Sequence, residues 1–256
     1  MIKAILFDLD ETLILDEPVV RHAFRVTALT VTRDPVKAAA LAMAAESHAK
    51  RLWLTMPPLA LEYAQRIGHS ALEGLWAEYN LGLEPERLLE LQMNRIRILA
   101  WAEALEETDL DGDAVELSER WIALRSRYPL YPDADELLAN LCGSYKLGVV
   151  TNGIAALQRK KWHGSGLEHW FEAIAISGEV AIGKPEKGIF EWVANQLEVK
   201  LENCLMVGDN SDRDVQGGIN AGTKTVWLDR GFKPKTVNAD FECKQLLEIL
   251  PWLETV

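Results

Sequence analysis

The chain has 256 residues, enough for one large domain or two with a sizeable core. Its 39 acidic residues outnumber 27 Lys and Arg, and the net charge of −12 argues against a surface that binds nucleic acid, which must gather positive charge. The 3 cysteines form no C-x-x-C pair, and no window suits a membrane span or signal peptide. We therefore expect a soluble, cytoplasmic protein without a membrane partner.

The first predicted element is an apolar strand that ends in acidic side chains. Within Ile2–Thr12 the apolar run stops at Asp8, and a second acidic residue, Asp10, follows after Leu9. Acidic residues and threonine after a strand often form a turn or cap a helix. The carboxyl ends of parallel strands are also where α/β proteins bind ligands, so this stretch is a candidate site.

A long helical region follows, from about Pro18 to Arg127. Apolar residues recur there at spacings of three and four, among abundant Ala, Glu, Leu and Arg. It is divided by four breaks, which are Arg33-Asp34-Pro35, Met56-Pro57-Pro58, Leu83-Glu84-Pro85 and Asp109 to Asp113. We interpret residues 16–128 as an all-helical insert that serves as a cap. We expect most of its aromatic residues to pack inside the helical bundle. The second interpretation is that some of them stack on a planar ligand. They include Trp53, Trp76, Trp101, Trp121, Tyr63 and Tyr79.

The chain then returns to strands that alternate with helices. The predicted strands are Tyr145–Thr151, Ala173–Ser177, Cys204–Gly208 and Thr223–Leu228, and the predicted helices are Asp133–Cys142, Ala155–His163, Glu186–Leu197 and Asp212–Ala221. Continuous apolar strands separated by helices predict a parallel sheet covered on both faces. Because the first strand has no partner nearby in the sequence, we expect it to join this sheet. Residues 1–15 and 129–256 would then form a Rossmann-like α/β core.

Polar residues follow three more of the predicted strands. They are Thr151-Asn152-Gly153, Gly183-Lys184-Pro185, and Gly208-Asp209 with Asp214. Taken singly, these are common signals of a turn, a surface lysine and a helix cap. Together with the acidic pair after the first strand, they place four carboxylates at one edge of the sheet, where they repel one another unless a cation compensates them.

A hard divalent ion with oxygen ligands, Mg²⁺ above all, is the expected cation. The Thr151 hydroxyl and the Lys184 ammonium supply donors for an anion opposite that metal. These are the parts that phosphoryl transfer needs.

The motifs occur in an order that resembles the haloacid dehalogenase superfamily, in its branch with a helical cap inserted after the first motif. They are FDLDET from Phe7, VVTNG from Val149, GKPEKGIF from Gly183 and VGDNSDRDVQGGINAG from Val207. The resemblance covers the whole predicted core. It implies a Mg²⁺-dependent phosphatase that hydrolyses phosphoric monoesters.

The resemblance also implies a role for each motif residue. Asp8 would be the nucleophile that forms an aspartyl-phosphate. Asp10 would protonate the leaving oxygen and then activate the water that releases phosphate. Thr151 and Asn152 would bind phosphoryl oxygens, and Lys184 would neutralise charge on the phosphate and on Asp8.

For the metal, the resemblance implies that Mg²⁺ is held by a carboxylate oxygen of Asp8, the backbone carbonyl of Asp10 and the side chain of Asp209. Asp214 would support a coordinated water. The implied substrate is a small phosphate ester, such as a nucleoside monophosphate, flavin mononucleotide or a sugar phosphate. The sequence does not set the oligomeric state, and a homodimer is one option.

Several alternatives compete with this interpretation. Gly178–Lys184 matches the start of a phosphate-binding G-x-x-x-x-G-K-[ST] loop, but Pro185 stands where the metal-binding hydroxyl belongs. Dehalogenation is disfavoured by Asp10, because a halide leaves without the proton that an oxygen leaving group needs. A sugar-phosphate mutase and a non-catalytic regulatory or interaction module on the same fold stay open, and metal-dependent phosphatase activity would separate them from a phosphatase.

Overall fold

The computed structural model describes residues 1–80 and 82–256, which divide into two compact units. One unit combines residues 1–15 with 128–256, and the other comprises residues 16–127. The sequence placed the second boundary one residue later. Tyr128 belongs with the first unit because its ring covers Gly164, where an added Cβ would lie 2.3 Å from Tyr128 Cδ2.

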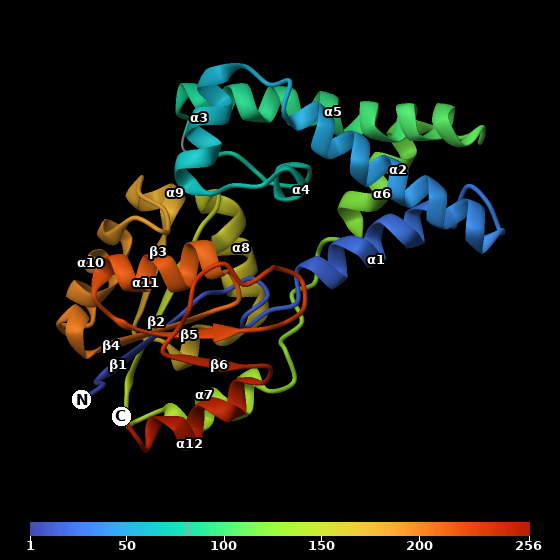
Figure 1. Cartoon of the computed structure of the whole chain (residues 1–256). Coiled ribbons are helices and arrows are strands. Elements are labelled where there is room, and N and C mark those ends of the chain that lie inside the picture. The colour runs from blue at the N-terminus through green and yellow to red at the C-terminus, as the bar shows by residue number, and fades with distance from the viewer. Residues whose placement is uncertain (81) are drawn as a thin grey trace. The chain divides into compact units, whose positions relative to one another are not determined.

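The first unit is built on one parallel sheet (Figure 1). Within the described residues its strands are β1 (Ala4–Phe7), β2 (Lys146–Thr151), β3 (Ala173–Ile176), β4 (Cys204–Gly208), β5 (Lys224–Leu228) and β6 (Phe241–Cys243). Their order in the sheet is β3-β2-β1-β4-β5-β6, and every pair is parallel. The predicted Rossmann-like α/β class is confirmed, and β1 lies between strands that follow it by more than a hundred residues.

The register of β1 aligns the strand ends that carry the polar motifs. Phe7 pairs with Val149 of β2 and with Val207 of β4. The next residues of all three strands therefore reach the same edge of the sheet. The strand order reverses between β1 and β4, and in such sheets ligands bind at the carboxyl ends of the strands around that point.

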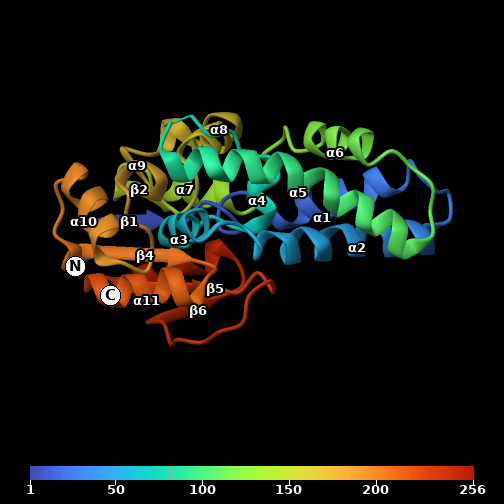
Figure 2. The same ribbon diagram turned by 90° about the horizontal axis from the view of Figure 1, so that it is seen from above.

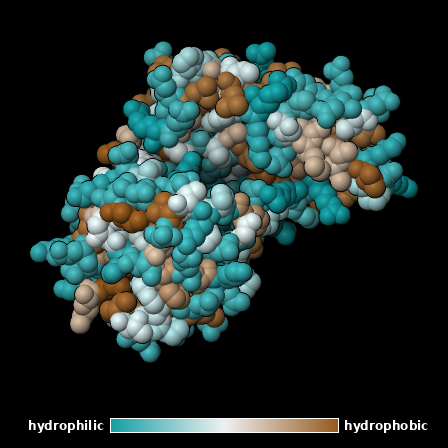
Figure 3. Space-filling model, viewed as in Figure 1, coloured by the Kyte–Doolittle hydropathy of each residue, from teal (hydrophilic) through white to brown (hydrophobic). Residues whose placement is uncertain are grey.

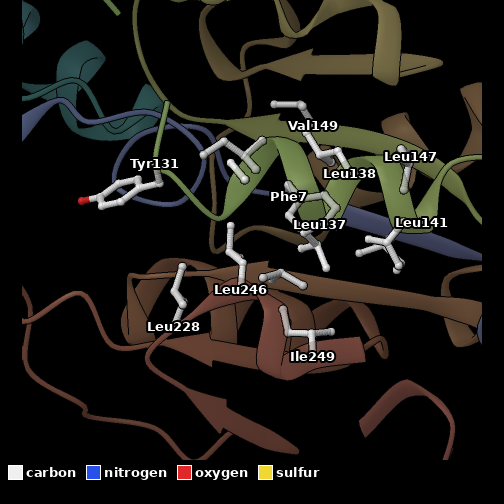
Figure 4. Close-up of a cluster of buried hydrophobic side chains, with 14 of the residues drawn as sticks. Phe7, Tyr131, Leu137, Leu138, Leu141, Leu147, Val149, Leu228, Leu246 and Ile249 are labelled. Carbon is white, nitrogen blue, oxygen red and sulfur yellow. The ribbon is translucent and has the colours of Figure 1, made fainter. Parts of the chain in front are cut away.

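Helices cover both faces of this sheet. They are α7 (Ala134–Leu141), α8 (Ala155–Ser165), α9 (Ser177–Val180), α10 (Lys187–Gln196), α11 (Gln216–Ala221) and α12 (Ile249–Leu253), with short turns η1 (Leu167–Trp170), η2 (Leu201–Asn203), η3 (Ser211–Val215) and η4 (Leu246–Glu248). Side chains of β1 alternate between the faces. Ile5 and Phe7 pack with α7 and α12, and Figure 4 shows Phe7 among these side chains, whereas Ala4 and Leu6 pack with α10. Burial on both sides explains why the strands are continuous apolar runs.

The regular structure of the second unit is helical throughout its described residues. Its helices are α1 (Glu17–Ala28), α2 (Pro35–Trp53), α3 (Pro58–Ile67), α4 (Ala71–Gly74), α5 (Glu84–Thr108) and α6 (Ala114–Ala123). The long helices α2 and α5 lie side by side in both views (Figures 1 and 2).

Four helices of this unit, α2, α3, α5 and α6, begin at the four breaks that the sequence predicts. Asp34 caps α2, because its Oδ1 accepts from the Val36 N–H at 2.8 Å. Asp113 caps α6 in the same way, accepting from the Val115 N–H at 2.8 Å. Proline stands in the first turn of α2, α3 and α5, where its missing N–H has no partner to lose.

Aromatic side chains fill the interior of the helical unit. The Phe24 ring lies 5.6 Å from Trp101 and 5.1 Å from Trp121, and all three are buried. Trp76 and Tyr63 are buried as well. The packing interpretation is therefore confirmed for these residues, and they give no argument for a substrate that carries a ring.

Several elements of the core differ from the sequence prediction, which did not include the short helices α9 and α12. The predicted helix Asp212–Ala221 begins as the wide π-type turn η3, and α11 starts only at Gln216. The edge strand β6 was not predicted, because its 3 residues follow a polar loop and are too few to establish a strand pattern.

Polar side chains cover most of the face that Figure 3 shows. Exposed apolar residues include Val36, Met43 and Leu54, each more than 70% exposed. No helix among the described residues combines the length and the apolar character that a bilayer crossing requires.

Candidate active site

Strand β1 delivers Asp8 to the carboxyl edge of the sheet, where the residue is buried. Its backbone N–H donates to the Val207 carbonyl at 2.9 Å, which continues the pairing with β4. The chain then turns sharply at Glu11, whose φ is 62°, and the Glu11 N–H donates to the Ile14 carbonyl. The turn returns Thr12 to the site, where its hydroxyl donates to Asp8 Oδ2 at 3.3 Å.

Arg230, in the loop after β5, stabilises this turn through side-chain contacts. Its guanidinium donates to the Thr12 carbonyl at 3.3 Å and pairs with Asp133 at 2.9 Å. It also lies 3.8 Å from the centre of the Tyr131 ring, whose hydroxyl donates to Glu11 at 2.6 Å. The backbone that presents the nucleophile candidate is thus held by polar contacts within one unit, of which the Tyr131–Glu11 bond is buried.

Lys184 lies between two of the predicted carboxylates. Its ammonium is 2.5 Å from Asp8 Oδ1 and 2.7 Å from Asp214 Oδ1, and all three side chains are buried. Burial alone would lower the pKa of Lys184, but the carboxylates of Asp214 and Asp8 outweigh it and raise that pKa above its usual value. The lysine is therefore a fixed positive charge against the Asp8 carboxylate.

Asn152 holds Lys184 in this place through its side-chain amide. The Lys184 N–H donates to Asn152 Oδ1 at 2.8 Å, and Asn152 Nδ2 donates to the Lys184 carbonyl at 2.9 Å. This reciprocal pair joins the loop after β2 to the loop before α10. Since the side chain is engaged with Lys184, a phosphate contact by Asn152 would have to come from its backbone N–H.

The turn η3 aims Asp214 back toward the end of β4. The Asn210 N–H donates to Asp214 Oδ2 at 2.9 Å, and the Asp214 N–H donates to the Asn210 carbonyl at 2.7 Å. Gly208 leaves room for this carboxylate, because an added Cβ would lie 2.2 Å from Asp214 Oδ2. The Trp227 indole N–H donates to the carbonyl of Asp209, just before this turn, at 2.9 Å and fixes the backbone there. Single π-type turns of this kind are frequent at functional sites.

Three of the predicted metal ligands meet at this edge. Asp8, Asp209 and Asp214 are buried and each offers an oxygen, with all these oxygens within 4.8 Å of one another. Within the described residues, Asp209 Oδ2 and Asp214 Oδ1 accept no hydrogen bond of good geometry, although lysine ammoniums lie 2.9 and 2.7 Å away. These residues fit a hard divalent cation such as Mg²⁺, which prefers carboxylate oxygens.

The electrostatics of the acidic group also favour a cation. Burial raises the pKa of Asp209 to about 8 against the nearby Lys233 ammonium, and the carboxylates of Asp8 and Asp214 add to the rise. Burial likewise raises the pKa of Asp214, against the opposing charge of Lys184. A divalent ion would reverse this penalty, because it favours the ionised carboxylates that bind it.

Asp10 and Thr151 are the two predicted residues whose side chains bond to helix α8. The Lys161 ammonium is 2.8 Å from Asp10 Oδ1, and Gln158 Nε2 donates to Asp10 Oδ2 at 2.9 Å. The same Gln158 nitrogen donates to Thr151 Oγ1 at 2.6 Å. The Asp10 side chain is not part of the three-carboxylate group described above.

The sequence analysis missed Lys233, Lys161 and Gln158. Lys233 contacts both carboxylate oxygens of Asp209, at 3.1 and 2.9 Å, and these charges raise its pKa although burial opposes the rise. It lies in a loop without regular spacing, so no pattern pointed to it. Lys161 did carry a signal, because it follows the buried Leu157 by one helical turn and so shares the inward face of α8.

The fold and this site place the chain among the parallel α/β enzymes that bind ligands at the carboxyl edge of the sheet. The family model for haloacid dehalogenase-like hydrolases matches residues 2–222. The chain belongs to this family, and the resemblance seen in the sequence is confirmed.

Relatives of known name narrow the class of enzyme. A phosphoserine phosphatase of Thermus thermophilus is 40% identical over 244 residues, which are 93% of this chain and 92% of the relative. The pyrimidine 5'-nucleotidase YjjG of Escherichia coli is 35% identical over 183 residues, or 68% of this chain and 77% of the relative. The chain is accordingly a phosphatase-type enzyme of the family, a hydrolase of phosphoric monoesters.

Solved structures agree on the fold. A HAD phosphatase from Thermococcus onnurineus has a TM-score of 0.56 at 25% identity, with 98% of each chain covered. An L-2-haloacid dehalogenase from Xanthobacter autotrophicus has a TM-score of 0.62 at 20% identity, with 99% of each chain covered. At that identity the dehalogenase shares the architecture, and the likeness says nothing of its reaction.

Proposed function

We propose that the chain is a Mg²⁺-dependent phosphomonoester hydrolase that works through an aspartyl-phosphate on Asp8. The observation that carries the proposal is the contact of the buried Asp8 carboxylate with the Lys184 ammonium at 2.5 Å, beside two further buried carboxylates. A carboxylate held next to a fixed cation is ready to attack phosphorus without repelling an anionic substrate.

The metal would be held by Asp8, Asp209 and the backbone carbonyl of Asp10, with Asp214 supporting the site. When bound, Mg²⁺ supplies positive charge that balances the phosphoryl group and the carboxylates. In the chain itself, Lys184 contributes a second positive charge. The Thr151 hydroxyl and backbone N–H groups of the loop after β2 would donate to the phosphoryl oxygens.

The reaction then has two steps that balance. An oxygen of Asp8 bonds to phosphorus while the ester P–O bond breaks, and Asp10 gives its proton to the departing oxygen, which leaves as an alcohol. Water next attacks the phosphorus and gives a proton back to Asp10, while the bond between phosphorus and Asp8 breaks. Phosphate leaves, and both aspartates return to their starting forms.

We place phosphoserine first among the substrates to be tested, because the relative that covers 93% of this chain carries the name of a phosphoserine phosphatase. Nucleoside monophosphates, flavin mononucleotide and sugar phosphates follow, in line with the nucleotidase relative and the motifs. We further propose that the helical unit acts as a cap that controls access to the substrate, since it is inserted at Asp16, shortly after the first motif.

The test is phosphate release from this panel by the purified chain, with Mg²⁺ and again with a chelator. We expect release that needs the metal and that is abolished by Asp8→Asn. Asp10→Asn should slow turnover by about 10²- to 10⁴-fold, the usual contribution of general acid–base catalysis. Rapid quenching of this slow variant should trap protein heavier by one phosphoryl group.

A matched pair of variants tests the metal assignment. Asp214→Asn should weaken Mg²⁺ binding, whereas Asp212→Asn, an exposed acid in the same turn, should leave it unchanged. Release that is equal with chelator, or an active Asp8→Asn variant, would refute the proposal. Transfer of phosphate to a second position of a sugar phosphate, without release, would instead indicate a mutase.

A further inference from the structure

Helix α8 turns two polar side chains into the interior of the core unit. Gln158 and Lys161 are both 0% exposed, and they lie one helical turn apart on the same face. A lysine is almost never fully buried unless its charge is paired, and a buried amide needs partners as well. Their position therefore calls for an explanation beyond the packing of the helix.

Both side chains bond to Asp10, one to each carboxylate oxygen. The Lys161 ammonium lies 2.8 Å from Oδ1, and Gln158 Nε2 donates to Oδ2 at 2.9 Å. A carboxylate held through both oxygens cannot rotate freely about its bonds.

Gln158 also connects Asp10 with the loop after β2. Its Nε2 donates to Thr151 Oγ1 at 2.6 Å, while its Oε1 is buried and accepts no hydrogen bond within the described residues. Gly153 makes room for this side chain, since an added Cβ would lie 3.0 Å from Gln158 Cγ. The amide is thus oriented toward Asp10 and Thr151 even though its own oxygen is left without a donor.

We propose that Lys161 and Gln158 are positioning residues that fix the Asp10 carboxylate for its proton transfers. The inference rests on the proposed function, in which Asp10 gives a proton to the leaving oxygen and takes one from water. Both proton transfers need the Asp10 carboxylate at the same place, and a small displacement of a catalytic group lowers the rate strongly. Neither Lys161 nor Gln158 touches the substrate in this account.

A different explanation is that Asp10 serves only to neutralise Lys161, so that the lysine stabilises the fold and has no bearing on catalysis. A double-mutant cycle separates the two explanations. Lys161→Met keeps the length of the side chain and removes its donors, and Lys160→Met makes the same change at the exposed neighbouring position. Each is made in the natural sequence and in Asp10→Asn.

If Lys161 acts through Asp10, Lys161→Met lowers kcat by roughly 10- to 100-fold and leaves KM within about twofold, the loss expected for a misplaced catalytic group. In the Asp10→Asn background the same change should cost less than about threefold, because the group it positions is already gone. Lys160→Met should be silent in both backgrounds. Lys161→Arg, which keeps the charge, should recover part of kcat.

Equal losses from Lys161→Met in both backgrounds, or an unchanged kcat, would overturn the inference while leaving the phosphatase in place. Should Lys161→Met not fold, Gln158→Met and Lys161→Arg are each combined with Asp10→Asn in the same double-mutant cycle. Losses of kcat that are equal with and without Asp10 would overturn the inference in that case too. A natural chain that releases no phosphate from any ester would overturn the proposed function and this inference with it.

Discussion

A methyl group at Gly208 tests how the three carboxylates of Asp8, Asp209 and Asp214 are held together. In Gly208→Ala the new Cβ would lie 2.2 Å from Asp214 Oδ2, 2.3 Å from its Cγ and 2.5 Å from its Cβ. Non-bonded heavy atoms in a protein interior sit at about 3.5–4.0 Å, so Asp214 would have to move by roughly 1 Å or more. Its carboxylate would then leave the Lys184 ammonium at 2.7 Å and the Asn210 N–H at 2.9 Å.

The magnitude follows from two costs. Overpacking a filled interior costs about 1–3 kcal/mol, and a lost hydrogen bond to a charged group costs about 1.5–3 kcal/mol. We expect the free energy of unfolding of the core unit to fall by about 2.5–6 kcal/mol, which corresponds to roughly 5–20 °C in the thermal midpoint of a protein of this size. Because Asp214 supports the proposed metal site, the affinity for Mg²⁺ should fall about 10- to 100-fold.

Gly188→Ala is the matched control. Its Cβ would meet only Ile182, at 3.0 Å from Cδ1 and 3.4 Å from Cγ2, and that side chain is 40% exposed, so solvent leaves room for it to shift. Alanine is also the better helix former, so this variant should unfold at the natural temperature or slightly above it. Thermal unfolding and calorimetric titration with Mg²⁺ measure both effects. A Gly208→Ala variant with the natural midpoint and the natural Mg²⁺ affinity would refute this account of the site.

Three further outcomes follow from other parts of the structure. Burial raises the pKa of Cys204 to about 11 and that of Cys243 to about 12, while Cys142 is exposed, so at pH 8 a thiol reagent should label one cysteine rapidly and all three only after unfolding. Asp34→Ala removes the cap of α2 and should lower the free energy of unfolding by about 1 kcal/mol in urea; no change would mean that the cap does not stabilise this helix. Arg230→Met removes the cationic partner of the half-buried Asp133 carboxylate, which keeps the Leu246 N–H, and should cost about 1.5–3 kcal/mol; a natural thermal midpoint would show that Arg230 does not hold the turn.

Much of the fold follows from signals that are local in the sequence. The break at Asp34-Pro35 combines a capping side chain with a residue suited to the first helical turn, and α2 begins there. The strands β2 and β4 are continuous apolar runs because helices cover both faces of the sheet. Such features need no knowledge of distant partners.

The parts that were missed depend on contacts between distant segments. Asn152 has the sequence context of a phosphate-binding residue, yet its side chain pairs with the backbone of Lys184, 32 residues away. Lys161 lies in a helix that was predicted, but its partner Asp10 is 151 residues away in the chain. The wide turn η3 arises because Asp214 folds back onto Asn210, which no helical periodicity encodes.

The central place of β1 also constrains how the chain can be made. This strand is synthesised before both of its partners in the sheet, which are β2, beginning at Lys146, and β4, beginning at Cys204. Contacts this distant in sequence form late, because the loop between them must close before pairing stabilises it. The helical unit can fold during that delay, whereas Asp8 gains its acidic neighbours only after residue 214 has been synthesised. A nascent chain of this protein thus carries the Asp8 carboxylate, the proposed nucleophile, without its neighbours in the site until the chain has been synthesised as far as Asp214.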